Sequence, residues 1–192
     1  MTDVNLKYDF NERPSSVLQA MMAWDYDSAH ALITEYADLD ERSLFGDTAL
    51  LLAVRYNKVD IYKELIQFGA DVNTQTAFGV SPLHVAAQNN NVPAIEYLLK
   101  NGADINIQDG WGRTPLYIAA TNNHREAVEL LLSHRPKVNE MTTRNETAYY
   151  SSNEYGYHAI ALLLEKAGAD TTLEPGEFDE GRSAFVSVLG FG

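Results

Sequence analysis

The sequence contains no cysteine, which excludes disulfide bonds and any metal site built on thiolates. Basic side chains are few: 14 lysines and arginines stand against 27 aspartates and glutamates, giving a formal net charge of −13. A chain of this charge repels the phosphate backbone of nucleic acids. Nucleic acid is therefore not expected as a partner.

Long apolar runs are also missing. No stretch approaches the ~18 apolar residues that a transmembrane helix requires, and residues 1–16 lack the apolar run of a signal peptide. We therefore expect a cytoplasmic protein with no membrane partner.

Motifs that carry catalysis are absent as well. The sequence has no glycine-rich nucleotide loop, no H-E-x-x-H and no G-x-S-x-G. Its histidines show no metal-ligand spacing; they are His30, His84, His124, His134 and His158. We expect no enzymatic activity, no cofactor and no bound metal.

A 33-residue period runs through the chain. It separates hydroxyl residues, which are Thr48, Ser81, Thr114 and Thr147. The same interval separates acidic and amide landmarks, which are Asp71 and Asp104, and Asn73, Asn106 and Asn139. Independent landmarks with one period over about a hundred residues indicate a repeat array.

Helix signals recur with this period. A hydroxyl residue can cap a helix at its start. Pro82 and Pro115 each follow one of these caps, at a position where helices tolerate proline. Gly102 can end a helix in a left-handed conformation. Arg135 stands where three other repeats have glycine. Keeping a left-handed conformation there costs roughly 1 kcal/mol, and Pro136 could alter this turn locally.

A 33-residue period that carries SPLHVAA at 81–87 and TPLYIAA at 114–120 resembles the ankyrin repeat. The resemblance implies an all-α solenoid of about five helix-turn-helix repeats with short finger loops, and it implies that His84 forms a structural hydrogen bond between neighbouring repeats. The expected segments are an N-terminal tail at 1–14, repeats at about 15–41, 42–74, 75–107, 108–140 and 141–172, and an acidic then apolar tail at 173–192. In the first repeat, the period places the helix cap at Ser15.

Acidic side chains concentrate towards the two ends. Residues 1–41 hold nine acidic and two basic side chains, and residues 171–192 hold four and one. Such ends either keep the array in solution or contact a basic partner. The apolar stretch 184–191 either covers the last repeat or docks on another chain, and residues 1–14 form either a loose tail or a strip along the first repeat.

The resemblance also implies that a partner contacts the finger tips and the exposed ends of the first helices. One finger position, repeated with the same period, holds Phe45, Phe78, Trp111 and Arg144. Aromatic side chains and arginine are enriched at interface hot spots, although these residues could instead pack against neighbouring fingers. The other candidate partner-binding residues are Leu44, Ala77, Val80 and Arg113 on the fingers and Arg55, Tyr56, Gln88, Asn89, Asn122 and Tyr155 at the helix ends.

These observations predict a non-catalytic protein–protein interaction module. In this interpretation the protein is a monomer that binds and masks one partner protein, a basic one, as an inhibitor or immunity-type protein. The alternative is an adaptor or scaffold that links two partner proteins.

Overall fold

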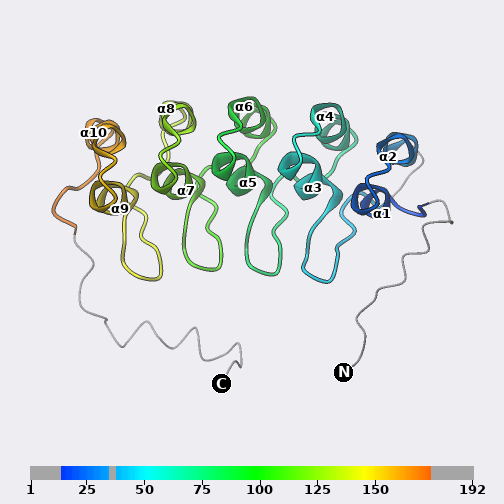
Figure 1. The fold of residues 1–192 in the computed structure, drawn as a ribbon, viewed down its shortest axis with the longest axis horizontal. Helices are drawn as coiled ribbons and strands as arrows, with labels where there is room; N and C mark the ends of the chain where they lie inside the picture. The colour runs from blue at the N-terminus through cyan, green and yellow to red at the C-terminus, as the bar shows by residue number, and fades with distance from the viewer. Residues whose placement is uncertain (1–13, 35–37, 174–192) are drawn as a thin grey trace, which may run out of the picture.

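The computed structural model describes residues 14–34 and 38–173, which form one elongated array of paired helices (Figure 1). These residues contain ten helices and no strand, so the expected all-α solenoid is confirmed. The helices are α1 (Val17–Met22), α2 (Tyr26–Ile33), α3 (Ala49–Arg55), α4 (Val59–Gln67), α5 (Pro82–Gln88), α6 (Val92–Lys100), α7 (Pro115–Thr121), α8 (Arg125–Ser133), α9 (Ala148–Glu154) and α10 (His158–Lys166).

The helices stand in two rows, with a row of hairpin loops beside them (Figure 1). The odd-numbered helices form the row next to the loops, and each packs against its even-numbered partner and against its neighbours in the same row. We call the loops fingers. The first finger is residues 38–48, the second 71–81, the third 104–114 and the fourth 137–147.

Each odd-numbered helix begins at a hydroxyl cap. The side chain of Thr48 accepts a hydrogen bond from the backbone N–H of Leu51, and the other predicted caps do the same three residues along, so these predictions are confirmed. The prediction for the first repeat is wrong by one residue. Ser16, not Ser15, accepts from the N–H of Gln19, because α1 is one residue shorter than its counterparts while α2 keeps the spacing of the other repeats.

The core runs along the whole array between the two rows of helices. Ala86 and Ala87 are fully buried, as is Leu98 on the partner helix, and small side chains allow such helices to pack closely. Burying one leucine side chain contributes roughly 2 kcal/mol. In the last repeat Ser152 and Asn153 stand at the positions of Ala86 and Ala87, and Ser152 is buried whereas Asn153 is exposed.

His84 joins two repeats, as the resemblance implies. The backbone N–H of Ser81 donates to its Nδ1, so the proton lies on Nε2, which donates to the carbonyl oxygen of Arg113 at 2.9 Å. The side chain is fully buried, and burial lowers the pKa of His84 below its usual value. Neutral His84 therefore connects the start of α5 to the third finger.

Helices α4, α6, α8 and α10 are each followed by a left-handed residue. Gly69, Gly102 and Gly168 have positive φ, and Arg135 takes the same conformation with φ of 56°. The turn before Pro136 is therefore not altered in this respect. The expected tails, 1–14 and 173–192, lie outside the described residues except for Pro14 and Leu173. Among the helices described, none has the length and apolar character needed to cross a bilayer.

Candidate partner-binding face

The finger tips are closed by one polar side chain in each finger. Its oxygen accepts hydrogen bonds from the backbone N–H groups two and four residues along the chain. These side chains are Ser43, Thr76, Asp109 and Thr142. They share the period of the repeats, a signal that the sequence-based interpretation did not use. Because every tip is closed in the same way, equivalent finger residues project in the same direction.

Neighbouring fingers are joined by their backbones. The carbonyl oxygen of Phe45 accepts from the N–H of Ala77 at 2.9 Å, and that of Phe78 accepts from the N–H of Gly110 at 2.8 Å. The third finger is bonded to the fourth in the same way, because the carbonyl oxygen of Trp111 accepts from a backbone N–H of the fourth finger at 2.8 Å. The four fingers therefore form a continuous hydrogen-bonded ribbon rather than independent loops.

This close approach determines which residue can follow each aromatic side chain. A Cβ atom on Gly46 or Gly79 would lie 2.7 Å from a backbone nitrogen of the next finger. Both glycines also have positive φ. In the fourth finger the equivalent residue is Asn145, with φ of 59°, and the described residues contain no fifth finger for its side chain to meet. Asparagine tolerates the left-handed conformation better than most residues.

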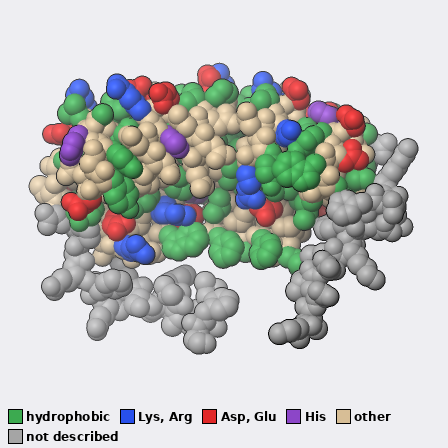
Figure 2. Space-filling view, viewed as in Figure 1, with side chains coloured by type: hydrophobic (Ala, Val, Ile, Leu, Met, Phe, Trp, Pro, Cys, Tyr) green, Lys and Arg blue, Asp and Glu red, His purple; other side chains and the backbone are tan. Residues whose placement is uncertain are grey.

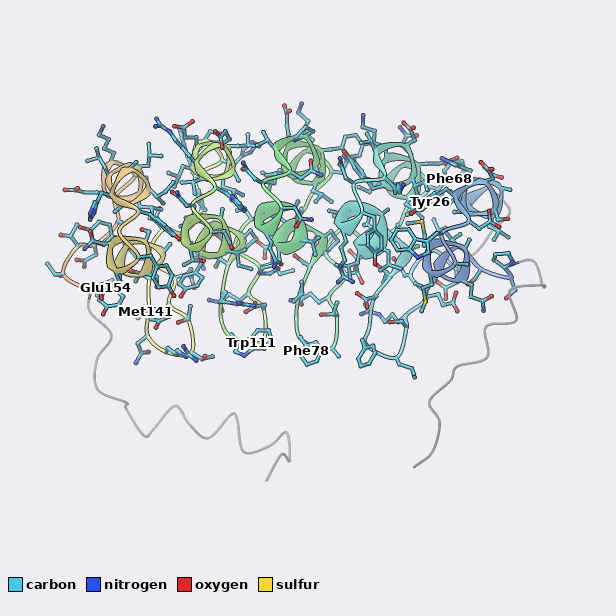
Figure 3. All side chains as sticks on the ribbon, in the orientation of Figure 1. Tyr26, Phe68, Phe78, Trp111, Met141 and Glu154 are labelled. Atoms are coloured by element: carbon cyan, nitrogen blue, oxygen red, sulfur yellow. The ribbon has the colours of Figure 1, made fainter. Side chains whose placement is uncertain are left out.

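The predicted aromatic ladder, Phe45, Phe78 and Trp111, lies at the finger tips and is exposed. The exposed fractions are 66%, 55% and 49%, so the prediction that these side chains face solvent is confirmed. Phe78 and Trp111 also stack on each other, with ring centroids 6.2 Å apart and planes 14° from parallel (Figure 3). Packing between fingers and exposure to solvent therefore coexist. That the ladder binds a partner stays a prediction.

Asp109, in the same finger, positions Trp111. The carboxylate of Asp109, which is fully buried, accepts from the N–H of Trp111 and pairs with the Arg113 guanidinium at 2.7 Å. The guanidinium carbon lies 4.7 Å from the Trp111 ring centroid, within the range of a cation–π contact. Charge-assisted bonds to a buried carboxylate are strong, so the backbone at Trp111 and the Arg113 side chain are held in place before any partner arrives.

Two hollows on this face collect most of the predicted residues. The middle hollow, of about 400 Å³, lies between the first two fingers and the ends of α3 and α5. The C-terminal hollow, of about 300 Å³, lies beside the third and fourth fingers. Predicted residues that line the middle hollow are Phe45, Phe78, Val80, Arg55, Gln88 and Asn89, and those that line the C-terminal hollow are Trp111, Arg113, Arg144 and Tyr155.

The floor of the C-terminal hollow is a hydrogen-bonded group that reasoning from sequence missed. The hydroxyl of Tyr117 donates to Glu146 at 2.8 Å and lies 3.1 Å from the hydroxyl of Ser151. Burial raises the pKa of Tyr117 to about 12, and the Glu146 carboxylate adds to the rise. Tyr117 is therefore protonated at neutral pH and fixes the carboxylate at the base of the hollow.

A third hollow, of about 300 Å³, lies between α1 and the first finger, and we call it the N-terminal hollow. Leu44, one of the predicted residues, and Phe45 line it together with Leu18, Leu52 and Glu41. The sequence placed Glu41 in the acidic N-terminal end that could contact a basic partner, but it did not identify Leu18, Leu52 or Glu41 as lining a hollow. The signal that could have found them is their position in the first helices and the first finger, which face the same side as the ladder.

Three predicted residues lie elsewhere on the face and line none of these hollows. Tyr56 packs on Trp24 with ring centroids 4.4 Å apart. The side-chain amide of Asn122 donates to the carbonyl of Ile118 at the end of its own helix. Ala77 is exposed and takes part in the finger ribbon through its backbone. Residues 14–34 and 38–173 contain no group of three or more histidine, aspartate or glutamate side chains arranged to hold a metal ion.

Comparison with protein-family models identifies the repeats. A model described as ankyrin repeats (3 copies) matches residues 18–109, and one described as ankyrin repeats (many copies) matches residues 89–132. A comparison with curated proteins finds no match.

Proposed function

The chain belongs to the ankyrin repeat family, and on this premise we propose that its finger tips and first helices bind and mask one partner protein. Ankyrin repeats generally mediate protein–protein interaction. Residues 14–34 and 38–173 form only the array, so this part of the chain acts on a partner by occupying its surface. This is the action of an inhibitor or immunity-type protein, and we take the protein to be a monomer before it binds.

The observation that carries the proposal is the exposed stack of Phe78 and Trp111. Large rigid aromatic side chains lose little conformational entropy when they are buried at an interface, and aromatic residues dominate binding energies. The buried Asp109 already fixes Trp111 and Arg113. Immobilising a side chain at an interface otherwise costs about 0.5–1.5 kcal/mol, and the ion pair with Asp109 lowers this cost for Arg113.

Charge supports a basic partner. The net charge of −13 attracts a positively charged protein over several ångströms and raises its association rate at low salt. The charges on the face itself are largely matched, because Arg55 pairs with Asp47 at 3.0 Å and Arg113 pairs with Asp109. Attraction by the whole molecule therefore brings the partner close, and contacts on the face provide the specificity.

The test is affinity capture of the partner from the native cell extract by the full chain and by the double variant Phe78→Ala/Trp111→Ala. The matched control is Phe68→Ala, because Phe68 is 54% exposed, as Phe78 is, but lies at the end of α4 in the other row (Figure 3). We expect the double variant to lose the partner and the control to keep it. Retention by the double variant would refute the ladder as the binding surface.

The same capture experiment separates masking from linking. An inhibitor holds one protein, and adding the pure chain abolishes that protein's activity. An adaptor holds two proteins, of which the ladder change removes only one. Deleting residues 173–192 in parallel shows whether a second protein depends on that segment.

A further inference from the structure

The N-terminal end of the binding face combines exposed apolar side chains with an excess of negative charge. Leu44 is 81% exposed and Phe45 is 66% exposed, and both line the N-terminal hollow. The other apolar side chains that line the hollow are Leu18, Met22 and Leu52. Figure 2 shows hydrophobic side chains next to Asp and Glu at the end of the array formed by α1 and α2.

Negative charge is concentrated at this end of the described chain. Between residues 14 and 47, leaving out 35–37, six carboxylates stand against one basic side chain, Arg42. From residue 48 to 173 there are thirteen carboxylates and ten lysines or arginines. Glu41, Arg42 and Asp47 line the N-terminal hollow itself, and Asp47 is paired with Arg55. The apolar hollow therefore lies at the end of the array where carboxylates outnumber basic side chains.

Resting on the function proposed above, we propose that the N-terminal hollow takes an apolar side chain from a cationic amphipathic segment of the partner, with the lysines or arginines of that segment beside Glu41. A purely apolar segment would leave the excess carboxylates of this end without counter-charges. A purely basic segment would leave Leu44 and Phe45 exposed to water. Only a segment with both properties complements both features.

The C-terminal hollow has a polar lining, whereas the N-terminal hollow has an apolar one. This difference fixes which way round the partner lies along the face. Its lining is mostly polar, with Thr142, Thr143, Arg144 and Glu146. An apolar anchor would lose hydrogen bonds there without covering a comparable apolar surface. Of the two end hollows, the one between α1 and the first finger therefore suits the cationic amphipathic segment.

The experiment uses the full chain and fluorescently labelled peptides, and it measures binding by fluorescence anisotropy at about 0.15 M salt. The probe is a 14-residue peptide of leucine and lysine with one apolar helical face. One comparison peptide has glutamate in place of lysine, and a second has alanine in place of leucine. We expect the leucine–lysine peptide to bind at least tenfold more tightly than either comparison peptide.

Variants locate the site. Leu44→Ser and Glu41→Gln should each weaken binding of the leucine–lysine peptide, the former about tenfold. The matched control for Leu44→Ser is Leu162→Ser, because Leu162 is 49% exposed on α10 at the far end of the array. Equal binding by Leu44→Ser and the unchanged chain, or equal weakening by the Leu162→Ser control, would overturn the proposal.

Two further measurements separate the possible outcomes. If the peptide binds only after residues 1–13 are deleted, then the chain's own N-terminal segment occupies the hollow and the proposal is wrong. Phe78→Ala/Trp111→Ala should leave peptide binding unchanged, because neither side chain lines the N-terminal hollow. One outcome would separate the two proposals. If the peptide binds as expected and the partner is still captured after the ladder change, the ladder is not the binding surface, while the N-terminal hollow is still supported as the site for a cationic segment.

Discussion

Replacing Gly79 with alanine tests whether the fingers stabilise the array by bonding to one another. Gly79 has φ of 75°, and an added Cβ atom would lie 2.7 Å from the nitrogen of Gly110 and 3.0 Å from backbone atoms of Asp109. None of these backbone atoms can move away as a flexible side chain would. The third finger must shift, and the hydrogen bond from Gly110 to the Phe78 carbonyl is then lost.

The matched control is Gly156→Ala, which isolates the contribution of the neighbouring finger. Gly156 has nearly the same φ, 76°, but an added Cβ would meet nothing within 4 Å. A left-handed alanine costs about 1–2 kcal/mol, and both variants share this cost. A lost backbone hydrogen bond adds about 1 kcal/mol, and residual crowding adds about as much again. We therefore expect Gly79→Ala to lose about 3–4 kcal/mol and Gly156→Ala about 1–2 kcal/mol.

The assay is equilibrium unfolding in urea, followed by circular dichroism, with the slope of the transition checked for two-state behaviour. Equal losses in the two variants would show that the contacts between fingers contribute nothing to stability. The idea of a continuous finger ribbon as a stabilising element would then have to be abandoned.

Three other changes test single residues. Tyr62→Phe should raise the free energy of unfolding by about 1 kcal/mol, because the hydroxyl of Tyr62 is buried and has no hydrogen-bond partner in the described part of the chain; a loss in urea unfolding would reveal a partner such as a buried water. Arg135→Gly should raise the free energy of unfolding by about 0.5–1 kcal/mol, because glycine relieves the strain of the left-handed conformation. No gain would mean that the arginine side chain makes compensating contacts. Burial holds the pKa of His84 below that of the unfolded chain, so His84 stabilises the fold above about pH 6.5 and this contribution falls as the pH drops below that value. The difference in unfolding free energy between pH 7.5 and 5.5 should therefore be smaller in His84→Gln than in the unchanged chain, and equal differences would contradict the role of His84.

Local chemistry made most of the fold predictable. A hydroxyl cap, a proline in the first turn and a glycine at the helix end each fix one backbone feature, and these features recur from one repeat to the next. The error at Ser15 has the same origin. Periodicity alone cannot register that α1 is one residue shorter than its counterparts, and Ser16 offers an equally good cap.

The candidate site was predictable only in part. The period placed Phe45, Phe78 and Trp111 at equivalent positions of successive fingers. Because the framework of the repeat does not dictate these positions, the sequence predicted that they lie at the surface. It did not reveal the ion pair between the buried Asp109 and the partly exposed Arg113, because this contact depends on how the finger closes in three dimensions. The hollows depend in the same way on the distance between fingers and helices, which no spacing in the sequence encodes.

The array has a mechanical consequence. Each helix makes its main contacts within its own repeat or with an adjacent repeat, and these contacts continue from α1 to α10. The array can therefore change its curvature, because small changes in packing at each junction between repeats add up along its length. Either end can fray without unfolding the middle. A partner that contacts both the α1 end and the α9 end would limit this change in curvature. Its binding would slow amide hydrogen exchange most in the terminal repeats.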